Sequence, residues 1–285
     1  METKPYVLEG ACQISPIIDG ERGGFEIVIP YKNSVIREKV WFYSKTARID
    51  LEFDIDWQEK MNTLKLSFPT AIKADKATCD IQFGHIERPT HRNTSWDMAK
   101  FEICAHKWID VCEYGYGFSV LSDSKYGYSV EGGRIRLTCL KCPSHPNPVA
   151  DVGHHEFRYA LLPHEGDFRE AGVIREAHSF NRPISVIELT KQSGELPERF
   201  SLVSVDRHAI IVETVKPAED GRGIIVRLYE SFGGTARAKI TVPVEFKKAT
   251  LTNLIERDIK ELDIINGEIK ITARPFEVIT LRLEK

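Results

Sequence analysis

The segment Ala47–Trp57, ARIDLEFDIDW, alternates apolar and polar, mostly acidic, residues. Successive side chains of a β-strand point to opposite faces, so Leu51, Phe53 and Ile55 are expected to face a core while the aspartates face water. The acidic face could suggest calcium, but a calcium loop also needs a turning glycine and closely spaced, varied oxygen ligands. We therefore interpret this segment as a strand with one buried and one solvated face.

Strand-like segments of this kind fill most of the chain. They alternate apolar and polar residues with period two and are bounded by turn residues. Gly132-Gly133 and Asn266-Gly267 supply the positive φ that tight hairpins need. The pattern predicts an all-β fold, with strands over 25–30, 35–44, 47–57, 63–69, 77–83, 118–123, 134–141, 153–164, 200–205, 209–217, 223–233, 236–244, 247–256, 268–275 and 277–284.

One strong helical pattern interrupts the strands. Apolar residues recur at helical spacing across Asp167–Asn181, Asp167 is suited to the N-cap, and Pro183 prevents continuation. We interpret this single helix as a connector between two domains. The expected domains are a large β-sandwich over residues 1–183 and a small C-terminal β-sandwich over residues 184–285.

Composition excludes several classes of partner. The 285 residues carry 39 basic and 42 acidic side chains, a net charge of −3, so no basic surface for nucleic acid is expected. No apolar run is long enough to span a bilayer, and the first residues lack the pattern of a secretory signal. Six cysteines do not form a dense disulfide framework, which suits a reducing compartment, so we expect a cytoplasmic protein.

Two groups of metal-ligating residues are interpreted as structural. Cys139 and Cys142 form a Cys-x-x-Cys, but no second such pair completes a zinc site, and a redox pair would normally open a helix. His154 and His155 are adjacent, so in a strand they point to opposite faces and cannot both reach one ion. We therefore expect no metal site in this chain.

The stretch Gly84–Tyr128 is the most unusual chemically. It combines histidines, tryptophans and tyrosines with charged and amide side chains, a mixture that a buried strand rarely needs. Planar aromatics beside hydrogen-bond donors can stack on and bind a sugar. The same aromatics could instead fill a sandwich core or a domain contact. No phosphate loop, dinucleotide motif or nucleophile elbow is present.

Several long segments resemble one enzyme family. They are RPTHRNTSWDMAKFEICAHKWIDV (88–111), EYGYGFSVLSDSKYGY (113–128), DVGHHEFRYALLPHEG (151–166) and VWFYSKTARIDLEFDIDWQEKMNTLKLSFP (40–69). Their sequence and order resemble the α-mannosidases of glycoside hydrolase family 38, most closely the cytosolic and bacterial branch. The resemblance implies a large, galactose-mutarotase-like β-supersandwich followed by a small β-sandwich, with one connecting helix.

The resemblance also implies that catalysis lies outside this chain. In the family an N-terminal α/β barrel holds a zinc ion, an aspartate nucleophile and an acid/base carboxylate, and performs retaining hydrolysis of α-mannosidic bonds. Nothing in this sequence matches those motifs, so we expect no catalytic residue and no cofactor here. The implied partners are the catalytic barrel of the same enzyme and a mannose-containing oligosaccharide. A surface that the barrel normally covers should be exposed, apolar and aromatic, and we expect it around the stretch Gly84–Tyr128.

In the family the large sandwich lends residues to the edge of the sugar site. Positions in the matching segments with sugar-binding or interface chemistry are His91, Asn93, Trp96, Asp97, Tyr114, Tyr116, Lys141 and His155. Two other functions stay open. The chain could be a stand-alone carbohydrate-binding module that uses its aromatic stretch, or a different, metal-independent carbohydrate enzyme on a mutarotase-like sandwich, since fold alone does not choose among sugar chemistries.

Overall fold

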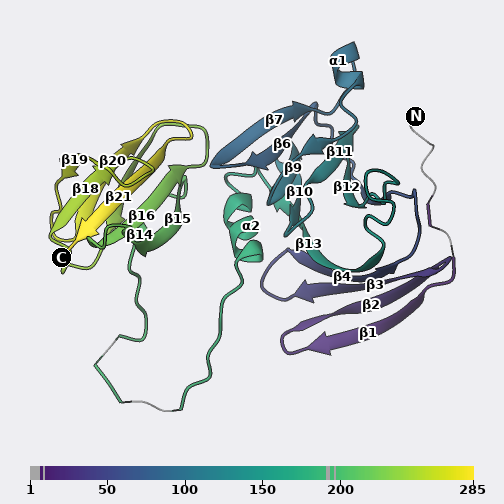
Figure 1. Cartoon of the computed structure of the whole chain (residues 1–285), viewed down its shortest axis with the longest axis horizontal. Helices are drawn as coiled ribbons and strands as arrows, with labels where there is room; N and C mark the ends of the chain where they lie inside the picture. Colours follow the sequence, from purple (N-terminus) through teal and green to yellow (C-terminus); the bar gives the residue numbers. More distant parts are fainter. Residues whose placement is uncertain (1–6, 9, 191–192, 196) are drawn as a thin grey trace. The chain divides into compact units, whose positions relative to one another are not determined.

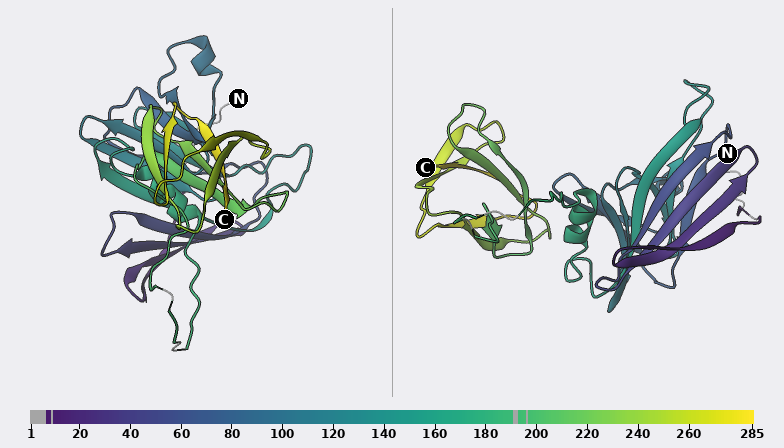
Figure 2. Two further views of the ribbon diagram at one scale, coloured as in Figure 1. Left: turned by 90° about the vertical axis from the view of Figure 1, so that its left-hand side faces the viewer. Right: turned by 90° about the horizontal axis from the view of Figure 1, so that it is seen from below.

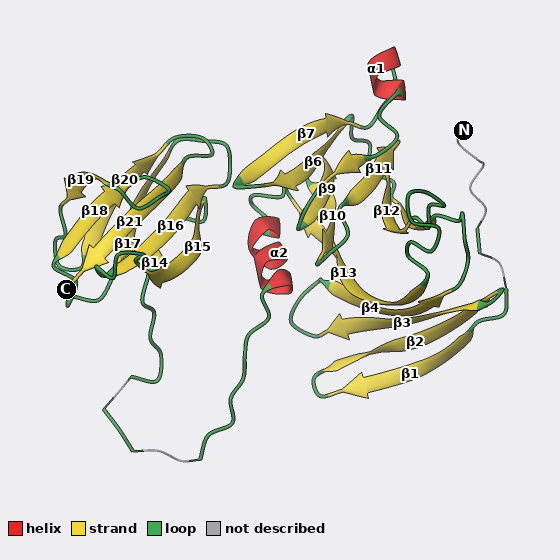
Figure 3. Cartoon of the chain, in the orientation of Figure 1, coloured by secondary structure: helices red, strands yellow, loops and turns green. Residues whose placement is uncertain are grey.

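The computed structural model describes residues 7–8, 10–190, 193–195 and 197–285. The chain forms two compact units (Figures 1 and 3). Unit 1 comprises Met1–Asp80 and Ile86–Pro183, and unit 2 comprises Ile81–His85 and Ile184–Lys285. Antiparallel strands build both units, as the period-two segments predict. The all-β fold class is therefore confirmed.

A nine-stranded sheet forms the larger layer of unit 1. Its order is β1-β2-β3-β4-β13-β10-β9-β6-β7, so the late strand β13 joins two groups of earlier strands. Figure 2 shows β1 to β4 side by side in this sheet. The bounds are β1 Gln13–Asp19, β2 Arg22–Tyr31, β3 Ser34–Tyr43, β4 Ile49–Trp57, β13 Gly153–Glu165, β10 Tyr116–Ser122, β9 Trp108–Glu113, β6 Lys76–Ile81 and β7 Gly84–Pro89.

A second sheet covers part of the inner face of the first. It has the order β5-β12-β11-β8, with bounds β5 Leu64–Pro69, β12 Arg134–Leu140, β11 Gly127–Glu131 and β8 Ile103–Cys104. One apolar core lies between the two sheets. The Gly132-Gly133 hairpin that joins β11 to β12 is confirmed, with positive φ at both glycines.

Strand β4 has the two faces that its sequence predicts. Leu51, Phe53 and Ile55 are at most 5% exposed and lie in the core. Phe53 stacks on Phe157 of β13, with ring centroids 5.0 Å apart and planes inclined by 2°. Such aromatic contacts across paired strands add to the area they bury. The pairing of β4 with β13 is thus fixed by side chains as well as by the backbone.

The inner face of the nine-stranded sheet continues past the second sheet. On β1 to β3 the residues that share the core-side face include Ile14, Ile18, Phe25 and Phe42, as the strand register shows. Their exposures are 61%, 85%, 47% and 44%. We call these four residues the apolar overhang. Exposed apolar faces of this kind are typical of interaction surfaces.

The main helix is shorter than the sequence predicts. Helix α2 spans Val173–Asn181, whereas the pattern predicted a start at Asp167. The Asp167 carboxylate instead accepts hydrogen bonds from the backbone N–H groups of Arg169 and Glu170, which closes a separate turn. Gly172 then adopts φ of +71°, so the backbone leaves the helical path before Val173.

The sequence also predicted one helix, and the structure has a second. Helix α1 is a single turn, Ser95–Met98, within the aromatic stretch. Helix α2 lies against β9 and β10 on the outer face of the large sheet, where Trp108 packs against Phe168 just ahead of the helix. Thus α2 covers a sheet face besides leading out of unit 1. Within the described residues, neither helix has the length and hydropathy to cross a membrane.

Unit 2 is a small β-sandwich of a three-stranded and a five-stranded sheet. The predicted Asn266-Gly267 hairpin turn is confirmed, with φ of +51° and +77°. The predicted strand 247–256 ends early, because the Asn253 side chain accepts hydrogen bonds from two following backbone N–H groups and forms a turn. The bounds are β14 Ser204–Val205, β15 Ile210–Pro217, β16 Ile224–Glu230, β17 Ala236–Thr241, β18 Lys248–Thr252, β19 Asp258–Leu262, β20 Glu268–Ala273 and β21 Val278–Glu284.

A buried arginine forms hydrogen bonds with two loops of unit 2. Arg282 on β21 is 1% exposed. Its guanidinium lies 2.8 Å from the Asp220 carboxylate and 3.2 Å from that of Asp258. It also donates to the carbonyls of Arg222 and Glu256. The planar fork of arginine satisfies all four acceptors at once, which a lysine could not do.

Arg282→Leu is expected to destabilise unit 2 by about 2–4 kcal/mol, because four charge-assisted hydrogen bonds are lost and two carbonyls lose a donor. Hydrogen exchange of peptides from β16 and β21 measures the change. Arg274→Leu is the matched control, since that side chain is 81% exposed and pairs only locally with Glu277. Equal protection in both variants would contradict the role given to Arg282.

Candidate functional site

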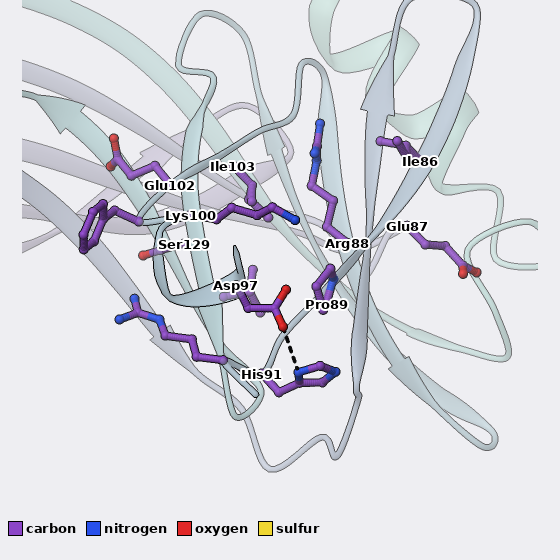
Figure 4. A pocket seen from close by; sticks show the side chains of 13 residues that line it. Ile86, Glu87, Arg88, Pro89, His91, Asp97, Lys100, Glu102, Ile103 and Ser129 are labelled. Atoms are coloured by element: carbon purple, nitrogen blue, oxygen red, sulfur yellow. Dashed lines mark ion pairs between the residues drawn. The ribbon is translucent and has the colours of Figure 1, made fainter. Parts of the chain in front are cut away.

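A pocket of about 230 Å³ lies within unit 1, in the stretch that the sequence marks as unusual (Figure 4). Strand β7 forms one wall, the α1 loop another, and β8 and β11 the rest. Its polar lining carries both signs of charge. The lining residues are Ile86, Glu87, Arg88, Pro89, His91, Arg92, Asp97, Lys100, Phe101, Glu102, Ile103, Ser129 and Val130.

Local sequence holds the α1 loop in place. Thr94 is the N-cap of α1, and its hydroxyl accepts a hydrogen bond from the backbone N–H of Asp97 at 3.1 Å. The Asp97 carboxylate accepts one in return from the backbone N–H of Thr94, at 3.2 Å. This reciprocal capping box is encoded by the spacing Thr-x-x-Asp. It fixes a helix that is too short to be stable by itself.

Asp97 is the acidic centre of the pocket. Hydrogen bonds from Thr94, assisted by the positive charge of Lys100, hold the pKa of its carboxyl below the usual range. Its Oδ2 lies 3.9 Å from Nδ1 of His91, and Figure 4 shows the two side chains directed toward one another. Asp97 is therefore ionised at neutral pH and acts as a hydrogen-bond acceptor.

Glu102 has a similar role at the pocket edge. Burial raises the pKa of its carboxyl, but hydrogen bonds from Lys65 and Thr138 outweigh this effect and lower it. Lys65 Nζ lies 2.7 Å from Glu102 Oε1. Asp97 and Glu102 are thus charged and already engaged. Neither has the raised pKa that a general acid at neutral pH requires.

Arg88 supplies a positive group from β7. Among the described residues, its buried Nε has no hydrogen-bond partner. A buried donor without a partner is costly and is usually satisfied by water or a ligand. The Arg88 guanidinium also lies close to the buried Cys79 thiol, whose pKa its positive charge lowers against the larger effect of burial. Asp97 and His91 remain as polar groups of the pocket that can contact a hydroxyl group. At about 230 Å³ the pocket is smaller than the roughly 300–1,000 Å³ of drug-sized ligand sites, so it suits one small polar group.

The structure separates the eight candidate residues into three places. His91 and Asp97 line the pocket, while Asn93 and the 80% exposed Trp96 lie on the same loop without lining it. The other four, Tyr114, Tyr116, Lys141 and His155, lie away from it. Arg88, Lys100 and Glu102 line the pocket but were not among the candidates, because only the fold brings β7 beside residues 100–102.

Two of the distant candidates are at a hairpin and two at a loop. Tyr114 and Tyr116 flank the β9–β10 turn, where Tyr114 is fully exposed and Tyr116 is 44% exposed. Lys141 and His155 both contact Asp151, the first through its backbone N–H and the second through Nε2, 2.9 Å from the carbonyl oxygen. These contacts explain the positions of Lys141 and His155 without a ligand.

The Cys-x-x-Cys is part of the protein interior. Cys139 and Cys142 are 5% and 2% exposed. Burial raises the pKa of the Cys139 thiol to about 12, so little thiolate forms at neutral pH. Burial also raises the pKa of Cys142. Both thiols therefore behave as small core side chains.

A second polar cluster lies buried on the outer face of the large sheet. His164 Nε2 is 2.8 Å from Asp110 Oδ1, and the Ser119 hydroxyl donates to the same oxygen at 2.7 Å. The Asp110 and His164 side chains are 0% and 6% exposed. A serine nucleophile needs the histidine between serine and aspartate, whereas here the aspartate lies in the middle. The cluster is structural.

Close packing against this cluster explains why the second glycine of EYGYG, Gly117, is a glycine. Gly117 lies opposite His164 in the β10–β13 pairing. A Cβ atom at Gly117 would lie 2.1 Å from Cε1 of the His164 ring. Only glycine leaves room for the imidazole there, so the strand glycine and the buried histidine depend on one another.

The two-unit β architecture, with a large two-layer sandwich and a small one, is that of the C-terminal part of a glycoside hydrolase. Residues 2–149 match the glycosyl hydrolases family 38 C-terminal domain, and residues 209–281 match the family 38 C-terminal beta sandwich domain. The chain belongs to this family.

Curated relatives are named as α-mannosidases. The chain is 38% identical to alpha-mannosidase G of Dictyostelium discoideum and 41% identical to alpha-mannosidase 2C1 of Homo sapiens, over 99% of its length in each case. It spans 27% and 28% of those proteins. A crystal structure of an α-mannosidase from Enterococcus faecalis V583 has the same fold, with a TM-score of 0.81, 17% identity, and coverage of 96% of this chain and 35% of that one.

The buried ion pair of His164 with Asp110 makes the stability of unit 1 depend on pH. Burial lowers the pKa of His164, but the hydrogen bond and charge of Asp110 outweigh it and raise the pKa above the usual value. The stability from this histidine is therefore fully present below the unfolded pKa of about 6.5 and is lost as the pH rises through the folded value. His164→Gln should cost more stability at about pH 6 than at about pH 9.

Urea unfolding followed by tryptophan fluorescence measures this difference. All four tryptophans, Trp41, Trp57, Trp96 and Trp108, lie in unit 1, so the signal reports that unit alone. His145→Gln is the control, because His145 lies on an exposed loop of the same unit. A loss that is the same at both pH values would refute the assigned direction.

Proposed function

We propose that this chain is the non-catalytic C-terminal part of a retaining α-mannosidase, where it supports a catalytic barrel and borders its sugar site. The observation that carries the proposal is the family match across both units, together with relatives named as α-mannosidases that share 38–41% identity over 99% of the chain. The chain spans little more than a quarter of their length, which leaves room for a separate catalytic domain.

The exposed apolar residues support a contact with such a domain. The apolar overhang of β1 to β3 lies on the core-side face of its sheet but has no cover among the described residues. Trp96, Met98 and Phe101 around α1 are 80%, 61% and 58% exposed. Burying large apolar side chains releases about 1.5–3 kcal/mol each, so a domain that covers them gains stability.

The pocket of the α1 loop supports a role at the sugar site. Its ionised Asp97 offers an acceptor for hydroxyl groups, and the exposed Trp96 offers a stacking surface. In this proposal the substrate is a mannose-containing oligosaccharide in the cytoplasm. The zinc ion of the reaction belongs to the catalytic domain.

The chain alone is expected to show no hydrolysis of an aryl α-mannoside, with or without added zinc, because neither Asp97 nor Glu102 has the raised pKa that a general acid needs. Release of the aryl alcohol measures turnover. Turnover that a chelator abolishes would overturn the non-catalytic role. Binding heat with millimolar mannose or α-mannobiose in calorimetry would instead favour a stand-alone carbohydrate-binding module.

The apolar overhang can be tested as the docking surface. Ile18→Asp should weaken association with a co-expressed N-terminal region of a family 38 α-mannosidase by about tenfold or more. The reason is that a charge would replace an apolar side chain that association would bury. Affinity capture of one part by the other measures it. Ile259→Asp, at a position 64% exposed on β19 of unit 2, is the matched control and should change little. Equal capture of both variants would exclude the overhang from the interface.

A further inference from the structure

Three side chains with metal-binding chemistry meet on the solvated face of β4 and β13. Glu156 lies directly opposite Asp54 in the register of the two strands. His154 is two residues before Glu156, so both point to the same face of β13. One ligand atom from each of Asp54, His154 and Glu156 lies within 4.8 Å of the other two. Antiparallel pairing, not sequence proximity, brings Asp54 into this group.

The distances suit a small metal ion. His154 Nε2 is 3.2 Å from Asp54 Oδ1 and 3.8 Å from Glu156 Oε1. A tetrahedral zinc ion with bonds of about 2.0–2.1 Å separates its ligand atoms by roughly 3.3 Å. The side chains of Asp54, His154 and Glu156 are 51%, 58% and 74% exposed, which leaves them room to rotate toward that geometry.

The two opposed carboxylates of the group can accept a cation. Asp54 and Glu156 are like charges directly opposite one another, an arrangement that destabilises a sheet unless a positive group compensates. Arg37 approaches Asp54 at 3.8 Å, through a side chain that is itself 47% exposed. A divalent ion between the carboxylates would neutralise both and use the histidine as third ligand.

Space for further ligands is present beside the group. A surface depression of about 310 Å³ is lined by Asp54 and Glu156 together with Arg37, Lys39 and Arg158. Water or a small anion can reach an ion there from this side. Three protein ligands with an accessible remaining position form a common zinc arrangement.

We propose that Asp54, His154 and Glu156 bind one zinc ion, which joins β4 to β13. A nitrogen ligand with two carboxylates favours zinc or a similar transition metal over magnesium and calcium, which prefer oxygen alone. This ion is separate from the zinc of the proposed reaction. The sequence analysis expected no metal because His154 and His155 point to opposite faces of the strand, and it did not consider Asp54 on the neighbouring strand.

Calorimetric titration of the full chain with zinc, in a non-thiol reductant, tests the site. The wild type is expected to bind one equivalent. His154→Ala, Asp54→Asn and Glu156→Gln should each weaken binding by at least about 10–100-fold, since losing an outer-shell partner already costs that much. His155→Ala is the matched control, because His155 is the adjacent histidine on the opposite face, and it should bind zinc as the wild type does. The His154 and Glu156 side chains are 58% and 74% exposed, so these substitutions should leave the fold intact.

Cobalt substitution distinguishes this site from cysteine ligation. Co²⁺ at Asp54, His154 and Glu156 should show visible absorption without the near-ultraviolet charge-transfer band of a thiolate, and His154→Ala should remove that spectrum. Circular dichroism confirms that each variant is folded. The proposal is overturned if the wild type binds no zinc at millimolar concentration, or if all three ligand variants bind it with unchanged affinity.

Discussion

The pairing of β4 with β13 is the interaction on which unit 1 depends. β13 pairs with β4 along one edge and with β10 along the other, so it joins β1–β4 to the rest of the nine-stranded sheet. On the inner face, Phe53 stacks between Phe157 and Tyr159. On the outer face the same register opposes Asp54 and Glu156. One pairing therefore builds the core and sets up a charged cluster that solvent or a cation must balance.

The two sheets of unit 1 differ in size, and the difference leaves part of the larger sheet uncovered. The four-stranded sheet covers the centre of the large sheet and leaves the inner side of β1 to β3 exposed, including Ile18 and Phe42. A protein that functions alone rarely exposes a core-side face. The chain spans 27% and 28% of the length of two family 38 relatives, so in the proposed function a further domain would cover this face.

Polar side chains of the same types occur both in a buried cluster and in a pocket that solvent can reach, and residue type alone does not tell the two apart. Asp110, Ser119 and His164 have the composition of a catalytic triad but the order and burial of a structural ion pair. Asp97 and His91, in contrast, line a pocket that solvent can reach. Burial and the order of the hydrogen bonds, rather than the identity of the side chains, distinguish a stabilising cluster from a binding site.

The sequence by itself determined the all-β class, the buried face of β4 and the Gly132-Gly133 and Asn266-Gly267 turns, because period-two alternation and turn chemistry are local properties. The family came from the resemblance of long segments. The sequence did not predict strands β1, β7, β9, β11 and β19. It misplaced the start of α2, since Asp167 could cap either the helix or the turn before it, and only the path through Gly172 decides. The tertiary structure alone placed Arg88 beside residues 100–102 and Asp54 beside His154. Those contacts depend on strand register and sheet order, which join residues far apart in the chain and leave no local pattern.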